Sequence, residues 1–188
     1  MKLIVNTQLL RRAAARVILF ITENTTDRGV DKNGKPFKPY SVKPFFMPSG
    51  AYINATTKSQ RAKLEASNSV HFKSSKGGKR YVIIEGGYAN FKAARFPQHG
   101  GKVNLHYSGT MMGSLAVIGE DANSITIGFT TKEAAERAYY HIVSGAGKSK
   151  VKRDFLGITK DQLEEVTQLL KSGISLDPRE VIKNITTG

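Results

Sequence analysis

Four prolines within thirteen residues are the feature that most restricts how this chain can fold. Proline donates no backbone hydrogen bond and clashes with a preceding helical turn, so residues 27–50 exclude a regular helix or a central strand. The same stretch is too rich in aromatic side chains for a free linker. We therefore expect an extended arm, about residues 27–57, that packs onto the core or a neighbouring subunit through Pro36, Phe37, Pro39, Tyr40, Phe45 and Phe46.

The segment before this arm has helical periodicity. From Thr7 to Ile21, apolar side chains recur every three or four residues, and arginines occupy mostly the other face. This pattern predicts one amphipathic helix of about five turns, capped by Asn6 or Thr7 and fraying near residues 24–26.

Two segments after the arm are typical of β-hairpins. Residues 70–72 and 81–84 flank the basic tract 73–80, which we expect to be a hairpin tip or a mobile loop. Residues 115–118 and 124–129 alternate in polarity on either side of a turn-forming stretch. Both segments therefore indicate antiparallel pairing.

Capping patterns predict the C-terminal helices. Thr130 and Glu133 have the spacing of a capping box, as do Thr159 and Gln162, and we expect Gly173 to end the second helix. Asp177, followed by a proline, predicts a short final helix. The expected fold is a single α+β domain over residues 1–188: an N-terminal amphipathic helix, antiparallel hairpins, two to three C-terminal helices, the arm and a basic β-hairpin insertion over about residues 58–102.

Charge is distributed unevenly along the chain. Residues 1–102 hold 19 Lys and Arg against 5 Asp and Glu, whereas residues 103–188 hold 10 of each. Such an asymmetry favours a polyanion or an acidic protein as partner. The side chains predicted to face DNA are Lys73, Lys76, Lys79, Arg80, Lys92 and Arg95.

Patterns that carry enzyme chemistry are missing from the sequence. Cysteine is absent, and the four histidines have no metal-ligand spacing. Residues 145–149 match only the end of a phosphate-binding loop, with Ile142 where that loop requires glycine. We expect no enzyme activity, no cofactor and no metal. The N-terminal apolar run is too short for a signal peptide, and no stretch is long enough to span a membrane, so we expect a soluble protein without membrane contact.

Four segments, in order, resemble the phage virion morphogenesis family, the tail-completion and neck proteins of tailed phages. The likeness covers most of the chain and is thinnest over residues 42–101. The segments are the N-terminal helix with Asp31–Ser41 after it, Leu105–Leu115, Ile125–Phe129 with Tyr139–His141, and Arg153–Thr159, which is similar to the family's R-x-F-L-G-L-(Ser/Thr) signature.

This resemblance implies a structural virion component, made in the host cytoplasm and located in the neck at the head–tail interface. The partners it implies are a homo-oligomeric ring, neighbouring portal, connector, neck or tail-terminator proteins, and packaged DNA met without sequence specificity. We expect the arm to reach an adjacent subunit and a docking segment after the loop at 144–153 to bind a core or a neighbour: Arg153, Phe155, Leu156 and Gly157.

Two other interpretations stay open. One is a tail terminator, whose ring would lie elsewhere in the particle. The other is a stand-alone nucleic-acid-binding protein, in which Tyr81, Tyr88 and Phe91 would form a stacking platform among basic neighbours.

Overall fold

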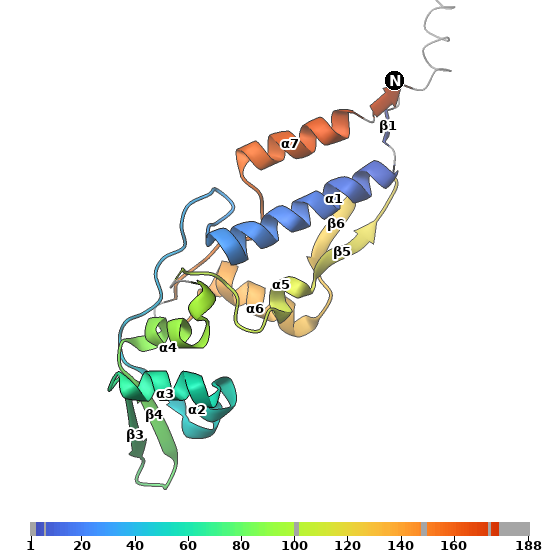
Figure 1. Ribbon diagram of the computed structural model, residues 1–188. Coiled ribbons are helices and arrows are strands. Elements are labelled where there is room, and N and C mark those ends of the chain that lie inside the picture. Colours follow the sequence, from blue (N-terminus) through green and yellow to red (C-terminus); the bar gives the residue numbers. More distant parts are fainter. Residues whose placement is uncertain (1–2, 6, 100–101, 148–149, 173, 177–188) are drawn as a thin grey trace, which may run out of the picture. The chain divides into compact units, whose positions relative to one another are not determined.

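The computed structural model describes residues 3–5, 7–99, 102–147, 150–172 and 174–176 (Figure 1). The chain divides into two compact units. The discontinuous unit combines Met1–Phe37 with Asn104–Gly188, and the inserted unit is Lys38–Val103. Helices and antiparallel strands occur in both units, so the predicted α+β class is confirmed.

The discontinuous unit is organised around its first helix. Helix α1 packs against helix α7 and against the β5–β6 hairpin, as Figure 1 shows. Its core contains Ala13, Phe20 and Val166. The elements are β1 (Leu3–Val5), α1 (Thr7–Thr22), η1 (Glu23–Arg28), α5 (Thr110–Gly113), β5 (Leu115–Glu120), β6 (Ile125–Phe129), α6 (Lys132–Tyr139), η3 (Tyr140–Ser144), α7 (Lys160–Lys171) and β7 (Ile174–Leu176), with β1 antiparallel to β7.

The inserted unit has a hydrophobic core of its own. A three-stranded antiparallel sheet of order β2–β4–β3 packs against its helices. The core residues that are almost fully buried are Tyr52, Leu64, Val82, Ile84 and Phe91. The elements are β2 (Phe45–Pro48), α2 (Ser49–Ala55), α3 (Lys58–Ala66), β3 (Val70–Ser74), β4 (Arg80–Ile84), α4 (Gly87–Arg95) and η2 (Pro97–His99).

Strand register separates this sheet into two faces. Phe45 pairs with Ile84, and Ile84 pairs with Val70, so these three share the face that carries the core. Phe46, Ile83 and His71 form the neighbouring row and therefore lie on the opposite face, which we call the outer face. Pro48, Tyr81 and Lys73 form the next row of that outer face.

Several sequence predictions are confirmed. The N-terminal helix and both hairpins form where expected, and Thr159 with Gln162 forms a complete capping box. The first capping box does not form, because Thr131 caps α6 with its side chain accepting from the Ala134 N–H. Gly173 and the helix expected from Asp177 lie outside the described residues.

The segment expected as an extended arm differs from that expectation over residues 45–55. These residues form strand β2 and helix α2. Strand β2 lies at an edge of its sheet, a position that tolerates proline. Pro48 therefore fits there, although it has no backbone N–H to donate to a neighbouring strand. Helices α3 and α4, within the expected hairpin insertion, were not predicted; the Thr57–Gln60 capping box that opens α3 was a readable signal.

The end of α1 also differs from the expectation of fraying. The chain continues through η1 as a π-helical turn, and Asn24 and Thr25 are buried. Gly29, in the left-handed conformation with φ 67°, ends this turn, and the Val30 N–H donates to the Asn24 carbonyl at 2.8 Å. No helix within the described residues is long and apolar enough to cross a membrane.

Candidate functional site

The inserted unit carries most of the protein's excess positive charge. Residues 38–103 hold 12 Lys and Arg against 2 Asp and Glu, a net charge of +10 out of the chain's +14. The two carboxylates are Glu65, on α3, and Glu85, just after β4. Strands β2, β3 and β4 and the β3–β4 turn contain no acidic residue. The sheet of this unit is therefore its most uniformly positive part.

Four of the predicted DNA-facing residues lie on the β3–β4 hairpin, and all four are exposed: Lys73, Lys76, Lys79 and Arg80. In the part of the chain that the structure describes, none of these side chains forms an ion pair with a carboxylate. The turn is ordered by its own hydrogen bonds, because the Ser75 N–H donates to the Lys79 carbonyl at 2.9 Å and the Gly78 N–H donates to the Ser75 carbonyl at 3.0 Å. The hairpin thus presents unneutralised cations on a defined turn.

The other two predicted DNA-facing residues belong to a different environment. Lys92 is 5% exposed, and its Nζ lies 5.5 Å from the centroid of the Tyr40 ring and 5.1 Å from that of Phe96. The Arg95 guanidinium lies 5.0 Å from the same Phe96 ring. These cations stabilise α4 through cation–π contacts. Lys92 cannot reach a polyanion without unpacking, so its predicted role is corrected.

The predicted stacking platform is not formed as a group. Phe91 is 1% exposed and belongs to the core, and the Tyr88 ring packs edge-on against Tyr40 and Phe45, at centroid distances of 5.1 and 5.6 Å. Tyr81 lies on the outer face of the sheet instead. Tyr88 and Phe91, both on α4, pack with ring centroids 6.0 Å apart in the core, whereas the strand register places Tyr81 on the opposite face.

The aromatic residues of the predicted interface arm are mostly used inside their own units. Phe37 is 7% exposed in the discontinuous unit. Phe45 packs 5.9 Å from Phe91, centroid to centroid, in the inserted unit. Pro36 and Pro39 are exposed, but Phe46 is the large apolar member of this set that stays open to solvent, at 60% exposed.

Gly87 shows how closely the chain before β2 is held. It has φ 68°, a conformation that glycine adopts readily, and a Cβ there would overlap the carbonyl oxygens of Ser41 and Lys43. The Ala89 N–H also donates to the Ser41 carbonyl at 3.1 Å. Residues 41–43 therefore lie against the start of α4 within the inserted unit.

The predicted docking segment binds within its own unit. Phe155 is 1% exposed, and its ring packs against that of Phe129 with centroids 6.5 Å apart. Arg153 is 6% exposed, and its N–H donates to the His141 carbonyl at 2.7 Å. Leu156 is half-exposed, and a Cβ at Gly157 would come within 2.8 Å of the Lys32 Cβ. The segment anchors the chain before α7 to the core.

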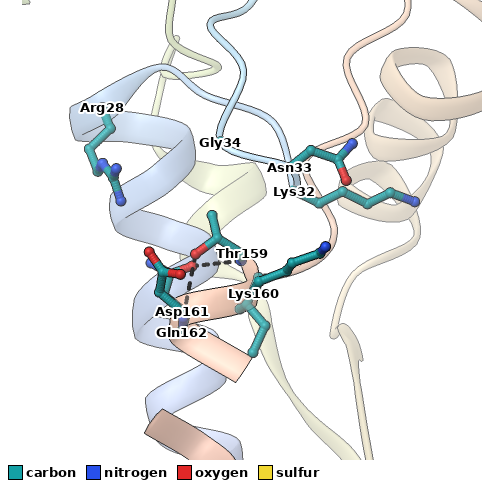
Figure 2. A pocket seen from close by; sticks show the side chains of 9 residues that line it. Arg28, Lys32, Asn33, Gly34, Thr159, Lys160, Asp161 and Gln162 are labelled. Atoms are coloured by element: carbon teal, nitrogen blue, oxygen red, sulfur yellow. Dashed lines mark hydrogen bonds between the residues drawn. The ribbon is translucent and has the colours of Figure 1, made fainter. Parts of the chain in front are cut away.

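The loop after η1 and the start of α7 line a pocket of about 450 Å³ in the discontinuous unit (Figure 2). Lys32 lies at its rim, with Nζ 2.7 Å from the Asp154 carboxylate, and the Lys32 N–H donates to the Asp154 carbonyl at 3.0 Å. The Asp154 carboxylate raises the pKa of Lys32 above its ordinary value. The lining residues are Arg28, Lys32, Asn33, Gly34, Ile158, Thr159, Lys160, Asp161 and Gln162.

A buried amide pair lies behind this pocket. The Asn24 Nδ2 donates to the Gln162 Oε1 at 2.8 Å, and the Gln162 Nε2 donates back to the Asn24 Oδ1 at 3.2 Å. The same Gln162 Oε1 accepts from the Thr159 N–H at 3.0 Å, which closes the capping box drawn in Figure 2. Arg28 donates to the Asn24 Oδ1 at 3.0 Å. One network therefore joins the end of α1 to the start of α7.

Among the described residues, no three His, Cys, Asp or Glu side chains gather as a metal site would require. The basic hairpin and the outer face are the candidate functional surface, because they gather exposed cations without a carboxylate. Comparison with known protein families, characterised proteins and solved structures gives no match for this chain.

Proposed function

We propose that this protein is a structural component of a tailed phage virion, forming a ring at the head–tail junction around the path of the DNA. Its partners would be further copies of itself and neighbouring portal, connector, neck or tail-terminator proteins. An assembly role of this kind involves no substrate and no cofactor.

The observation that carries this proposal is where the family-like segments fall. Three of the four, Leu105–Leu115, Ile125–Phe129 with Tyr139–His141, and Arg153–Thr159, belong to the discontinuous unit. The fourth begins there with α1 and runs on to Ser41. Residues 42–101, where the likeness is thinnest, lie wholly inside the inserted unit, which has its own core. An insertion into a neck-protein fold would produce this division.

Apolar side chains exposed on the discontinuous unit suit a ring. Tyr139 and Tyr140 are 54% and 57% exposed, Val143 is 48% exposed and Leu163 is 55% exposed. Apolar surface of this kind, when it gathers in patches, marks contact with other proteins. Heterologous contacts between identical subunits close into rings when the rotation between them allows it.

The charge of the inserted unit suits contact with DNA inside such a ring. Lys and Arg side chains that neutralise phosphates bind without sequence specificity. The same charge also favours the second candidate, a stand-alone nucleic-acid-binding protein. A tail terminator remains the third candidate, since it differs from a neck protein mainly in the position of the ring.

Electron microscopy of particles made without this protein tests the proposal. The gene is disabled in the phage or prophage that carries it, and the lysate is imaged. Separate DNA-filled heads and finished tails would support the neck role, and tails of abnormal length would favour the terminator. Normal infectious particles would overturn any virion role and leave the nucleic-acid-binding protein as the leading hypothesis.

Complementation with variants then tests the ring contacts. Replacing Tyr139 and Tyr140 together by serine is expected to lower phage titre, because both rings would leave a subunit interface. Glu133→Gln changes an exposed polar residue of the same helix and is the matched control. Equal titres for the two variants would argue against an interface at these tyrosines.

A further inference from the structure

The outer face of the β2–β4–β3 sheet combines two aromatic side chains, the exposed Phe46 and the half-buried Tyr81, with cations. Phe46 is 60% exposed and shares a row with Ile83 and His71, while Tyr81 and Lys73 occupy the adjacent row. Rows on one face of a sheet are two residues apart, or roughly 7 Å. Phe46 and Tyr81 therefore lie on neighbouring strands and neighbouring rows of one surface.

The helices of the inserted unit pack on the inner face of the sheet, while on the outer face Ile83 is 8% exposed and Phe46 is 60% exposed. The core residues contributed by the sheet are Phe45, Met47, Val70, Val82 and Ile84, all of them on the inner face by register. Tyr52 of α2, Leu64 of α3 and Phe91 of α4 complete the same core. The Phe46 ring lies on the opposite side of the sheet and is exposed to solvent, so it takes no part in this core.

The charge next to this face is of one sign. The hairpin from Val70 to Ile84 carries four Lys and Arg and no Asp or Glu. Lys73 lies on the outer face itself, and Lys76 and Lys79 lie at the turn that ends it. Phe46 lies on one edge strand, Tyr81 on the central strand and Lys73 on the other edge. A surface that places aromatic rings beside a basic margin is complementary to a strand with unpaired bases and a phosphate backbone.

From this arrangement we propose that the outer face binds single-stranded nucleic acid. Phosphates would be held by Lys73, Lys76 and Lys79, and bases would stack on Phe46 and Tyr81. A duplex would meet the same lysines, but its bases are already stacked on one another and leave the two rings without a partner. The two aromatic residues would thus make this surface prefer a single strand to duplex DNA.

The proposal extends the nucleic-acid contact that the proposed function includes, and it can fail separately. Its test uses the purified full-length protein and free oligonucleotides, whereas the proposed function is tested on assembled particles. Separated heads and tails, together with no oligonucleotide binding, would retain the neck role and reject this surface.

Fluorescence anisotropy with labelled oligothymidine of about 16 nucleotides measures the binding. A duplex of the same length, at about 150 mM salt, is the comparison ligand. The unchanged protein is expected to bind the single strand more tightly than the duplex. Phe46→Ala should weaken single-strand binding by about fivefold or more, the loss of one stacked base. Replacing Lys73 and Lys79 together by glutamine should reduce the slope of log affinity against log salt by about 1.4.

Matched variants elsewhere in the inserted unit serve as controls. Lys58 and Lys63 are exposed on α3, so replacing both by glutamine removes the same charge from the helical side. Phe72→Ala is the control for Phe46→Ala. Phe72 is 59% exposed and lies on the same sheet, but on the inner face, with its ring 6.2 Å from that of Tyr52. Circular dichroism of each variant separates a loss of binding from a loss of folding.

Weaker binding by the outer-face variants but not by the controls would support the proposal. Equal or tighter binding of the duplex, unchanged by Phe46→Ala, would overturn it in favour of contact through charge alone. An equal loss from the α3 variant would also overturn it. No binding at this salt concentration would overturn it in favour of an acidic protein partner.

Discussion

Gln162→Ala is expected to destabilise the discontinuous unit more than a helix-cap substitution normally does. The Gln162 side chain makes three hydrogen bonds, one to the Thr159 N–H and two with the Asn24 amide. Asn24 is 1% exposed, so its Nδ2 loses its partner at a buried site. Its Oδ1 retains the bond from Arg28.

The magnitude follows from these contacts. A buried donor left unsatisfied costs about 1–3 kcal/mol, and the lost capping bond adds about 1 kcal/mol. The expected loss in the free energy of unfolding is therefore about 2–4 kcal/mol. Replacing both Asn24 and Gln162 by leucine removes donor and acceptor together. The double variant should therefore lose less free energy of unfolding than the sum of the losses for Asn24→Leu and Gln162→Leu.

Chemical unfolding followed by far-ultraviolet circular dichroism measures these losses. The chain offers a matched control in Gln60, which closes the capping box of α3 in a more exposed setting, with its Oε1 accepting from the Thr57 N–H at 2.9 Å. The Gln60 Nε2 also donates to the Arg95 carbonyl at 2.7 Å, but neither of its bonds is fully buried, so Gln60→Ala should cost less, about 1–2 kcal/mol. The two units can unfold in separate transitions, so each is fitted by itself.

A loss for Gln162→Ala no larger than that for Gln60→Ala would refute this reasoning, because burial would then add nothing to the cap. Strict additivity in the double variant would refute it as well, since it would show that the two amides are not energetically coupled.

Three further outcomes are expected. Phe155→Ala should lower the free energy of unfolding by about 3–5 kcal/mol because the side chain is 1% exposed, whereas Leu156→Ala, at a half-exposed neighbour, should cost much less; thermal unfolding compares them, and equal losses would contradict the core role of Phe155. The raised pKa of Lys32 adds stability that is present below its ordinary value of 10.5 and is lost as the pH rises through the raised value. In alkaline titrations monitored by circular dichroism, the unchanged protein should therefore lose more stability than the Asp154→Asn variant. Parallel curves for the two proteins would contradict a stabilising Lys32–Asp154 ion pair. Gly87→Ala should destabilise the inserted unit, since its Cβ would meet backbone oxygens; an unchanged unfolding midpoint would show that this approach can relax.

Local patterns in the sequence determined much of the secondary structure. Helix α1, the β3–β4 and β5–β6 hairpins and the capping box at Thr159 follow from periodicity and from side chains acting on nearby backbone groups. The concentration of charge before residue 103 was also readable, because charge depends on composition alone. These features require no knowledge of distant contacts.

The unpredicted helices show where local patterns end. Helices α2, α3 and α4 are short or polar, and they pack on the core through single buried side chains such as Tyr52 and Leu64. Isolated helices of this length are marginal in water, so packing on the sheet stabilises them. The π-helical turn after α1 is likewise held by a partner 138 residues away, Gln162.

Tertiary structure alone decided which candidate site residues are available. Lys73 and Lys92 look alike in sequence, yet one is exposed on the sheet and the other is 5% exposed between aromatic rings. Phe45 and Phe46 are adjacent, but alternation along β2 sends one into the core and the other to solvent. The sequence determined that this protein would be basic, aromatic and built of helices and hairpins. The register of three strands decided which of those side chains face outward, because a shift of one residue exchanges the two faces.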